Sequence, residues 1–168
     1  MEDEPDRFTV VTEGGITWLM GGEHRWPCAQ HEHQDIEMPA VTERQVVHRI
    51  RRVRIMVESG WEISVVWGPG TYGSNWDAFM EPEKFSETPT HVEVAVLWDG
   101  PWEPCSYVTP DELADMVLQM SMWPSPNRLG PPSWAIEGGS CRPAKPAGGY
   151  PDHAPSMVEV PPNGPPEE

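Results

Sequence analysis

The sequence predicts a small α+β domain: a largely antiparallel sheet of three to five strands, two helices on one face of it, and a disordered C-terminal tail. Short runs with apolar residues at alternate positions recur, separated by turn residues, which is typical of antiparallel strands. Two other segments repeat apolar residues every three or four positions, as helices do. The chain beyond residue 123 is rich in Pro and Gly and has no apolar period.

With 168 residues, the chain can form one modest hydrophobic core with extensions. We expect an N-terminal hairpin and a His/Cys-containing loop over residues 1–40, and an α+β core over residues 41–123. Residues 124–168 form the predicted tail, because they bury too little apolar surface to offset the entropy of ordering.

Residues 7–20 contain two β-rich runs around Glu13-Gly14-Gly15, which predicts a hairpin. Residues 21–40 show no period and are predicted to be a loop. Residues 42–59 favour a helix, since apolar residues recur at steps of four, three and four: Val46, Ile50, Val53 and Val57. A strand remains the alternative there, because every second residue from 53 to 57 is also β-branched.

Residues 61–67 and 90–98 alternate apolar with other side chains and are predicted to be strands. Residues 102–108 are predicted to form a short third strand, at a sheet edge because of Pro104. A second helix is expected to follow, with Thr109 as N-cap and Glu112 completing a capping box. Its buried stripe would be Leu113, Met116, Val117 and Met120.

The formal net charge is −16, and only the segment around RIRRVR is basic. This balance disfavours nonspecific binding to nucleic acids or anionic membranes. We interpret the arginines as a solvated face paired with nearby carboxylates, with nucleic-acid contact as the alternative. The three cysteines suggest no disulfide framework, and the acidic N-terminus has no signal peptide, so we expect a cytosolic protein that does not enter a membrane.

The segment WGPGTYGSNW matches the G-x-G-x-x-G spacing of dinucleotide-binding loops at Gly68, Gly70 and Gly73. Pro69 removes one N–H that would face a pyrophosphate, and neither a long helix nor a parallel β-α-β unit is predicted around it. We therefore interpret this segment as a glycine-shaped loop between antiparallel strands. Its polar and aromatic side chains are the predicted partner-binding residues: Tyr72, Ser74, Asn75 and Trp76.

Four side chains between residues 24 and 33 are of types that bind zinc: His24, Cys28, His31 and His33. Their spacing matches no familiar zinc motif, so solvated loop histidines are the favoured interpretation and a structural zinc site is the alternative. HEHQD also partly matches the H-x-H-x-D motif of binuclear metallohydrolases, but Ile36 replaces its final histidine. No other catalytic arrangement is indicated, so no cofactor and no enzymatic activity are expected.

One block of the sequence resembles small uncharacterised proteins encoded by actinobacterial phages. It comprises a segment ending in ESGW, then EISVVWGPGTYGSN, VEVAVLWDGPW and YVTPDEL, within residues 42–123. The resemblance implies a phage origin and the cytoplasm of a bacterial host, and it carries no catalytic residues. We therefore expect a non-enzymatic accessory protein that binds a host or phage protein. The alternatives are a virion-associated protein whose Pro-rich tail orders on a neighbouring subunit, and a small zinc-stabilised domain.

Overall fold

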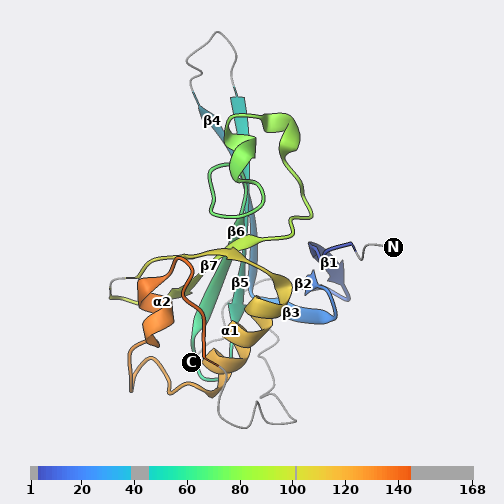
Figure 1. Cartoon of the computed structure of the whole chain (residues 1–168). Coiled ribbons are helices and arrows are strands. Elements are labelled where there is room, and N and C mark those ends of the chain that lie inside the picture. The colour runs from blue at the N-terminus through green and yellow to red at the C-terminus, as the bar shows by residue number, and fades with distance from the viewer. Residues whose placement is uncertain (1–3, 39–45, 101, 145–168) are drawn as a thin grey trace.

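The computed structural model of the protein describes residues 4–38, 46–100 and 102–144. These residues form two antiparallel sheets and two α-helices, which confirms the predicted fold class (Figure 1). The smaller sheet has the order β1 (Phe8–Glu13), β2 (Ile16–Gly21) and β3 (His24–Cys28). The larger sheet has the order β4 (Gln30–Met38), β5 (Val46–Met56), β6 (Glu62–Trp67), β7 (Val92–Leu97) and β8 (Cys105–Val108).

The predicted N-terminal hairpin is confirmed. Strands β1 and β2 pair with Glu13 opposite Ile16, and Gly14 and Gly15 form the connection between them. Both glycines have positive φ, of 58° and 81°. The tight turn needs this backbone conformation, and glycine adopts it without a steric penalty.

The prediction of a loop over residues 21–40 is wrong, because this segment contains the strands β3 and β4. The chain leaves the smaller sheet at Cys28 and enters the larger one at Gln30. Between them the N–H of Ala29 donates to the carbonyl of Arg54 at 2.8 Å. Strand β4 lies at the edge of the larger sheet and pairs only with β5 there. An edge strand can be polar throughout, so no apolar alternation marked it in the sequence.

The prediction of a helix over residues 42–59 is also wrong from residue 46 onward, and residues 42–45 lie outside the described part of the chain. Residues 46–56 form β5, which pairs antiparallel with β4 on one side and β6 on the other. Val53, Ile55 and Val57 are buried in the core. Their alternation along the sequence is the basis for the alternative prediction of a strand. Pairing on both sides satisfies the backbone groups of β5, and its β-branched residues suit a pleated surface.

Strands β6 and β7 follow the predicted segments and pair antiparallel, and β8 is the predicted edge strand. Helix α1 (Pro110–Met122) begins with the predicted capping box. The Glu112 N–H donates to Thr109 Oγ1 at 3.3 Å, and the Thr109 N–H donates to Glu112 Oε2 at 3.0 Å. All four residues of its predicted apolar stripe are buried.

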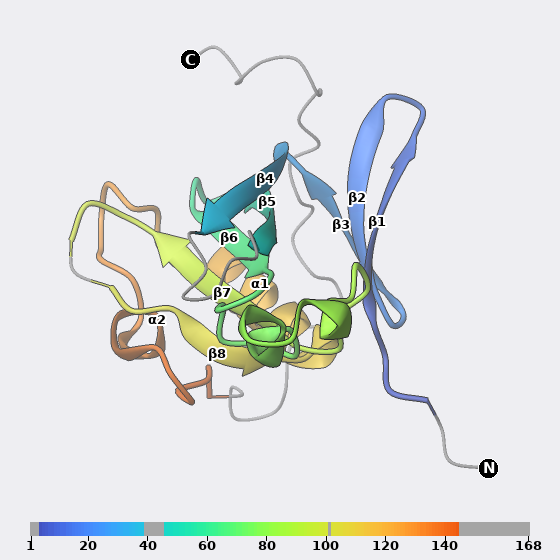
Figure 2. The same ribbon diagram turned by 90° about the horizontal axis from the view of Figure 1, so that it is seen from above.

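Helix α1 packs across one face of the larger sheet, close to β3 of the smaller sheet (Figures 1 and 2). The resulting core combines inward side chains from both sheets with those of α1. Its largest fully buried side chains include Trp61, Trp67, Phe8 and Leu19. Among the described residues, no helix combines the length and apolar composition needed to cross a bilayer.

The prediction of a disordered tail is wrong for residues 124–144. Residues 145–168, the rest of that tail, lie outside the described part of the chain. Helix α2 (Ser133–Glu137) buries Trp134 and Ala135 in the core. Gly139 forms a parallel bridge with Cys105, beside the edge strand β8. Proline-rich connections can therefore accompany a packed core when one large aromatic side chain anchors them.

Candidate functional site

The candidate site lies on the connection between β6 and β7, residues 68–91, which we call the platform loop. Its first turn is closed by Thr71, whose N–H and hydroxyl both donate to the Gly68 carbonyl, at 3.1 and 2.7 Å. Gly70 has a φ of 79°, which favours glycine. A Cβ on Gly73 would lie 2.6 Å from the carbonyl oxygen of His91. Backbone shape and close packing thus account for the glycine spacing.

The surroundings of this loop are those of a β-connection. Strands β6 and β7 are antiparallel, as predicted, and the loop leads into the 3-10 helices η1 (Trp76–Phe79) and η2 (Pro82–Lys84). A dinucleotide-binding loop instead joins a strand to a long helix in a parallel β-α-β unit. The G-x-G-x-x-G match is therefore explained by the turn.

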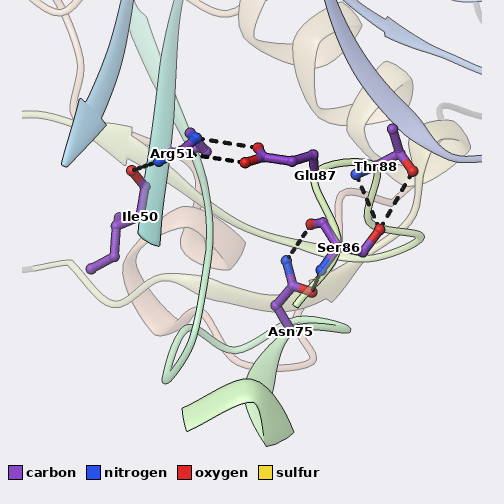
Figure 3. Close-up of polar contacts among 6 residues, drawn as sticks. All are labelled: Ile50, Arg51, Asn75, Ser86, Glu87 and Thr88. Atoms are coloured by element: carbon purple, nitrogen blue, oxygen red, sulfur yellow. Dashed lines mark hydrogen bonds and ion pairs between the residues drawn. The ribbon is translucent and has the colours of Figure 1, made fainter. Parts of the chain in front are cut away.

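Asn75, which was predicted to bind a partner, is turned inward (Figure 3). Only 2% of its surface is exposed. Its Nδ2 donates to the Ser86 carbonyl at 2.8 Å, and its Oδ1 accepts from the Ser86 N–H at 2.9 Å. These two bonds join the beginning of the platform loop to residues 86–89, which we call its far arm. Asn75 positions the loop and does not present itself to a partner.

Ser74, also predicted to bind a partner, has a similar bracing function although it is exposed. Its Oγ accepts from the N–H groups of Thr90 and His91, at 3.2 and 3.3 Å. The N–H of Ser74 donates to the His91 carbonyl at 3.1 Å. Ser74 therefore fixes the start of the platform loop against its end.

The far arm of the loop is held by two other strands. Arg51 of β5 forms a two-bond ion pair with Glu87, at 3.2 and 2.9 Å (Figure 3). Near β1, the Phe8 N–H donates to the Pro89 carbonyl at 2.8 Å, and Arg7 donates to the Thr88 carbonyl at 2.9 Å. A loop braced at this many points can hold its exposed side chains in a defined geometry.

Tyr72 and Trp76 are the predicted binding residues that reach solvent, with 47% and 43% of their surfaces exposed. Their rings are stacked, with centroids 5.2 Å apart and planes 8° from parallel. We call this pair the Tyr72–Trp76 platform. The Tyr72 N–H donates to Glu93 Oε2 at 3.0 Å, and the Tyr72 carbonyl accepts from the Tyr107 N–H at 2.7 Å. The backbone of the platform is thus tied to β7 and β8.

Sequence reasoning missed three exposed apolar side chains of the same region. Tyr107 on β8 is bonded to the backbone of Tyr72, and its own φ of 53° is unusual for a residue with a side chain. Phe79 and Met80, at the end of η1, are 43% and 80% exposed. Exposed aromatic and methionine side chains are enriched where proteins bind one another. Only Met80 and Phe79 are close enough in sequence to Trp76 to have been considered with it.

The four candidate zinc ligands occupy different environments. His24 Nε2 lies 2.8 Å from Asp111 Oδ1, and its ring stacks on Trp26. The Cys28 thiol is buried and donates to the Trp26 carbonyl, and burial raises its pKa to about 12. His31 and His33 lie on β4, with the side chain of His33 outside the described part of the structure. No group of three or more His, Cys, Asp or Glu side chains arranged for a metal occurs among the described residues.

The arginine-rich segment lies on β5, and two arginines whose side chains are described there, Arg51 and Arg54, pair with carboxylates. Arg51 is buried against Glu87, and Arg54 Nη1 lies 3.2 Å from Glu62 Oε1 on the neighbouring strand β6. Arg52 is exposed between them. The predicted pairing with carboxylates is therefore correct for Arg51 and Arg54. The element is a strand, however, and the predicted solvated position is wrong for Arg51, which is buried.

Comparison of the chain with protein-family models, curated proteins and solved structures gives no match in any of the three.

Proposed function

We propose that this protein is a non-enzymatic protein-binding module that recognises its partner through the Tyr72–Trp76 platform. The observation that carries the proposal is the exposure of two stacked rings on a loop that the hydrogen bonds of Asn75 and Arg51 hold in place. Rigid aromatic side chains lose little conformational entropy on binding and supply a large contact area. The bracing reduces that cost further.

The platform is the proposed centre of a larger contact. A stable protein interface buries about 800 Å² on each partner, which is more than two rings provide. Tyr107, Phe79 and Met80 supply further exposed apolar surface near the platform. The carboxylates of this region would form the polar rim that surrounds such a centre.

We propose a host or phage protein as the partner, in the cytoplasm of a bacterial host. This part of the proposal rests on the resemblance of residues 42–123 to actinobacteriophage proteins. The acidic composition supports a cytoplasmic protein that acts by specific contact, since a charge of −16 disfavours adhesion to nucleic acids.

The test is affinity capture with the full-length chain from lysates of infected and uninfected host cells, followed by measurement of Kd with the purified partner. We expect the Trp76→Ala and Tyr72→Ala variants each to weaken binding by at least about tenfold, as substitution of an interface hot spot does. Trp102→Ala is the matched control, because Trp102 is 40% exposed on the β7–β8 connection, outside the platform loop. Thermal unfolding of each variant verifies that the fold is retained.

Retention of the same partner with unchanged Kd by the Tyr72→Ala/Trp76→Ala double variant would disprove the proposal. A partner whose affinity falls only with Trp102→Ala would place the interface elsewhere.

A further inference from the structure

We infer that the partner places a cationic side chain, an arginine, on the Tyr72–Trp76 platform. This inference rests on the proposed function and specifies the chemistry of the partner. Tyr72 and Trp76 stack within 8° of parallel and remain nearly half exposed. An exposed aromatic face attracts a cation through its quadrupole, and tryptophan does so most strongly. A planar guanidinium can also stack on such a ring, which an ammonium cannot do.

The charges around the platform favour a cation. Residues 72–93 contain five carboxylates and a single basic residue, Lys84. Lys84 is itself engaged in an ion pair with Glu81, and Glu87 is neutralised by Arg51. Asp77, directly after Trp76, is exposed, and so is Glu83 on η2. The charge that remains near the platform is therefore negative.

Glu93 adds a carboxylate at the base of the platform. Its Oε2 accepts the Tyr72 N–H at 3.0 Å, so the carboxylate is held against the backbone of Tyr72. A carboxylate has more acceptor sites than this single bond uses. A guanidinium on the platform has N–H donors at its edge that suit carboxylate oxygens nearby.

The chain uses the same contact within its own fold. The Arg25 guanidinium carbon lies 3.9 Å from the centroid of the Trp18 ring on the smaller sheet. Trp18 is 9% exposed, and the guanidinium lies over its ring. At the Tyr72–Trp76 platform, equivalent rings are present without a covering cation from the described residues.

An apolar anchor would fit the same place less well. It would remove water from the carboxylates of Asp77 and Glu93 without supplying hydrogen-bond donors, which costs free energy. An arginine supplies both apolar contact with the rings and donors for the carboxylates. The expected partner segment is therefore basic at its centre.

The test is selection of random displayed peptides on the full-length protein, with the Tyr72→Ala/Trp76→Ala variant used to remove peptides that bind elsewhere. A selected peptide is then synthesised with each arginine replaced in turn by citrulline, which is similar in shape but uncharged. We expect one replacement to weaken binding by about fivefold to thirtyfold, the range of a partly desolvated cation–π contact. We also expect Kd to rise with NaCl concentration.

Charge variants of the protein sharpen this test. Asp77→Asn should weaken binding of the arginine peptide more than binding of the citrulline peptide, because a carboxylate attracts a guanidinium cation more strongly than a neutral urea. Glu13→Gln is the control, since Glu13 is an exposed carboxylate at the end of β1, outside the platform loop. It should alter neither affinity.

The outcomes separate the two proposals. Peptides that require Trp76 but bind equally well with citrulline, or that contain no arginine, would overturn the arginine inference and leave the platform as a binding site. A failure to select any peptide that depends on Tyr72 or Trp76 would also overturn the arginine inference, and the affinity capture with the double variant decides the proposed function separately.

Discussion

Arg51 and Glu87 form a two-bond ion pair that joins β5 to the far arm of the platform loop. The Arg51 side chain is 9% exposed, while that of Glu87 is 52% exposed. Nε and Nη2 of Arg51 each donate to a different oxygen of Glu87, a planar arrangement that only arginine provides. The pair therefore helps to position the far arm, together with the bonds made by Asn75, Phe8 and Arg7, although its carboxylate is partly hydrated.

Loss of the Glu87 charge should destabilise the fold more than loss of a neighbouring surface charge. We expect Glu87→Gln to lower the free energy of unfolding by about 1–2 kcal/mol, since the buried Arg51 loses the negative charge of Glu87 and solvent screens only part of the effect. Arg52→Gln is the control, because Arg52 is exposed on the same strand, and it should change stability by less than about 0.5 kcal/mol. Urea unfolding followed by tryptophan fluorescence measures both. Equal effects would contradict the structural importance of the pair.

Gly73 should not tolerate a methyl group. A Cβ there would lie 2.6 Å from the His91 carbonyl oxygen, which belongs to the backbone at the start of β7 and cannot easily move. We expect Gly73→Ala to destabilise the protein by about 2 kcal/mol or more. Gly14→Asn is the comparison, since Gly14 has open space around it and a φ of 58° that asparagine accepts. Its cost should stay below about 1 kcal/mol, as measured by the shift of the urea midpoint. A Gly73→Ala protein as stable as Gly14→Asn would contradict the close approach.

Trp134 should contribute as a core residue, even though it lies in a Pro-rich part of the chain. It is 5% exposed, packs in the core and donates a hydrogen bond from its indole to Gln119 of α1. We expect Trp134→Ala to cost about 3–5 kcal/mol. Trp102→Ala, at an exposed position, should cost less than about 1 kcal/mol. Calorimetric unfolding distinguishes them, and similar values would show that α2 does not stabilise the core.

The three cysteines should differ in reactivity towards iodoacetamide at pH 8. Burial raises the pKa of Cys28 to about 12 and that of Cys105 to about 11, so both remain protonated and shielded. Partial desolvation and then Glu137 raise the pKa of Cys141 as well, but this side chain is accessible. Because thiolate is the reactive form, we expect slow alkylation of Cys141 in the folded protein. All three should react after denaturation, as mass spectrometry can show. Early modification of Cys28 would contradict its burial.

Zinc content should be low, because no group of three or more His, Cys, Asp or Glu side chains is arranged for a metal among the described residues. The Cys28 thiol is buried and donates to the Trp26 carbonyl. His24 bonds to Asp111, whereas the Cys28 thiol bonds to Trp26, so these two candidate ligands have different partners. We expect elemental analysis of protein purified without chelators to find well below one zinc per chain. Stoichiometric zinc that is lost in the Cys28→Ser variant would instead support the predicted metal site.

Several elements could be predicted because their signals are local. The capping box before α1 involves residues three positions apart, and the Gly14-Gly15 turn needs only its own backbone conformation. The alternation in β6 and β7 places apolar residues on the face that packs in the core, although residues of the other face, such as Ser64 and Ala95, are buried as well. In the same way, Tyr72 and Trp76 could be recognised as large aromatic residues in a connection with no core period.

Other features depended on contacts between distant parts of the chain. Residues 46–56 suit either a helix or a strand, and pairing with both β4 and β6 makes them a strand. Helix α2 packs against the core because Trp134 is buried among residues that are far away in the sequence. The sequence could place Asn75 in the loop, but it could not show that the side chain is buried, because its partner Ser86 lies eleven positions later.

The sequence by itself determined the antiparallel α+β class, the capped helix α1 and the glycine-shaped loop, because neighbouring residues carry these patterns. Only the tertiary structure decided that β5 is a strand, that α2 packs, and that the loop presents Tyr72 and Trp76 while turning Asn75 inward. Burial and pairing are properties of segments that meet in space, and their free energies exceed the weak local preferences of the residues involved.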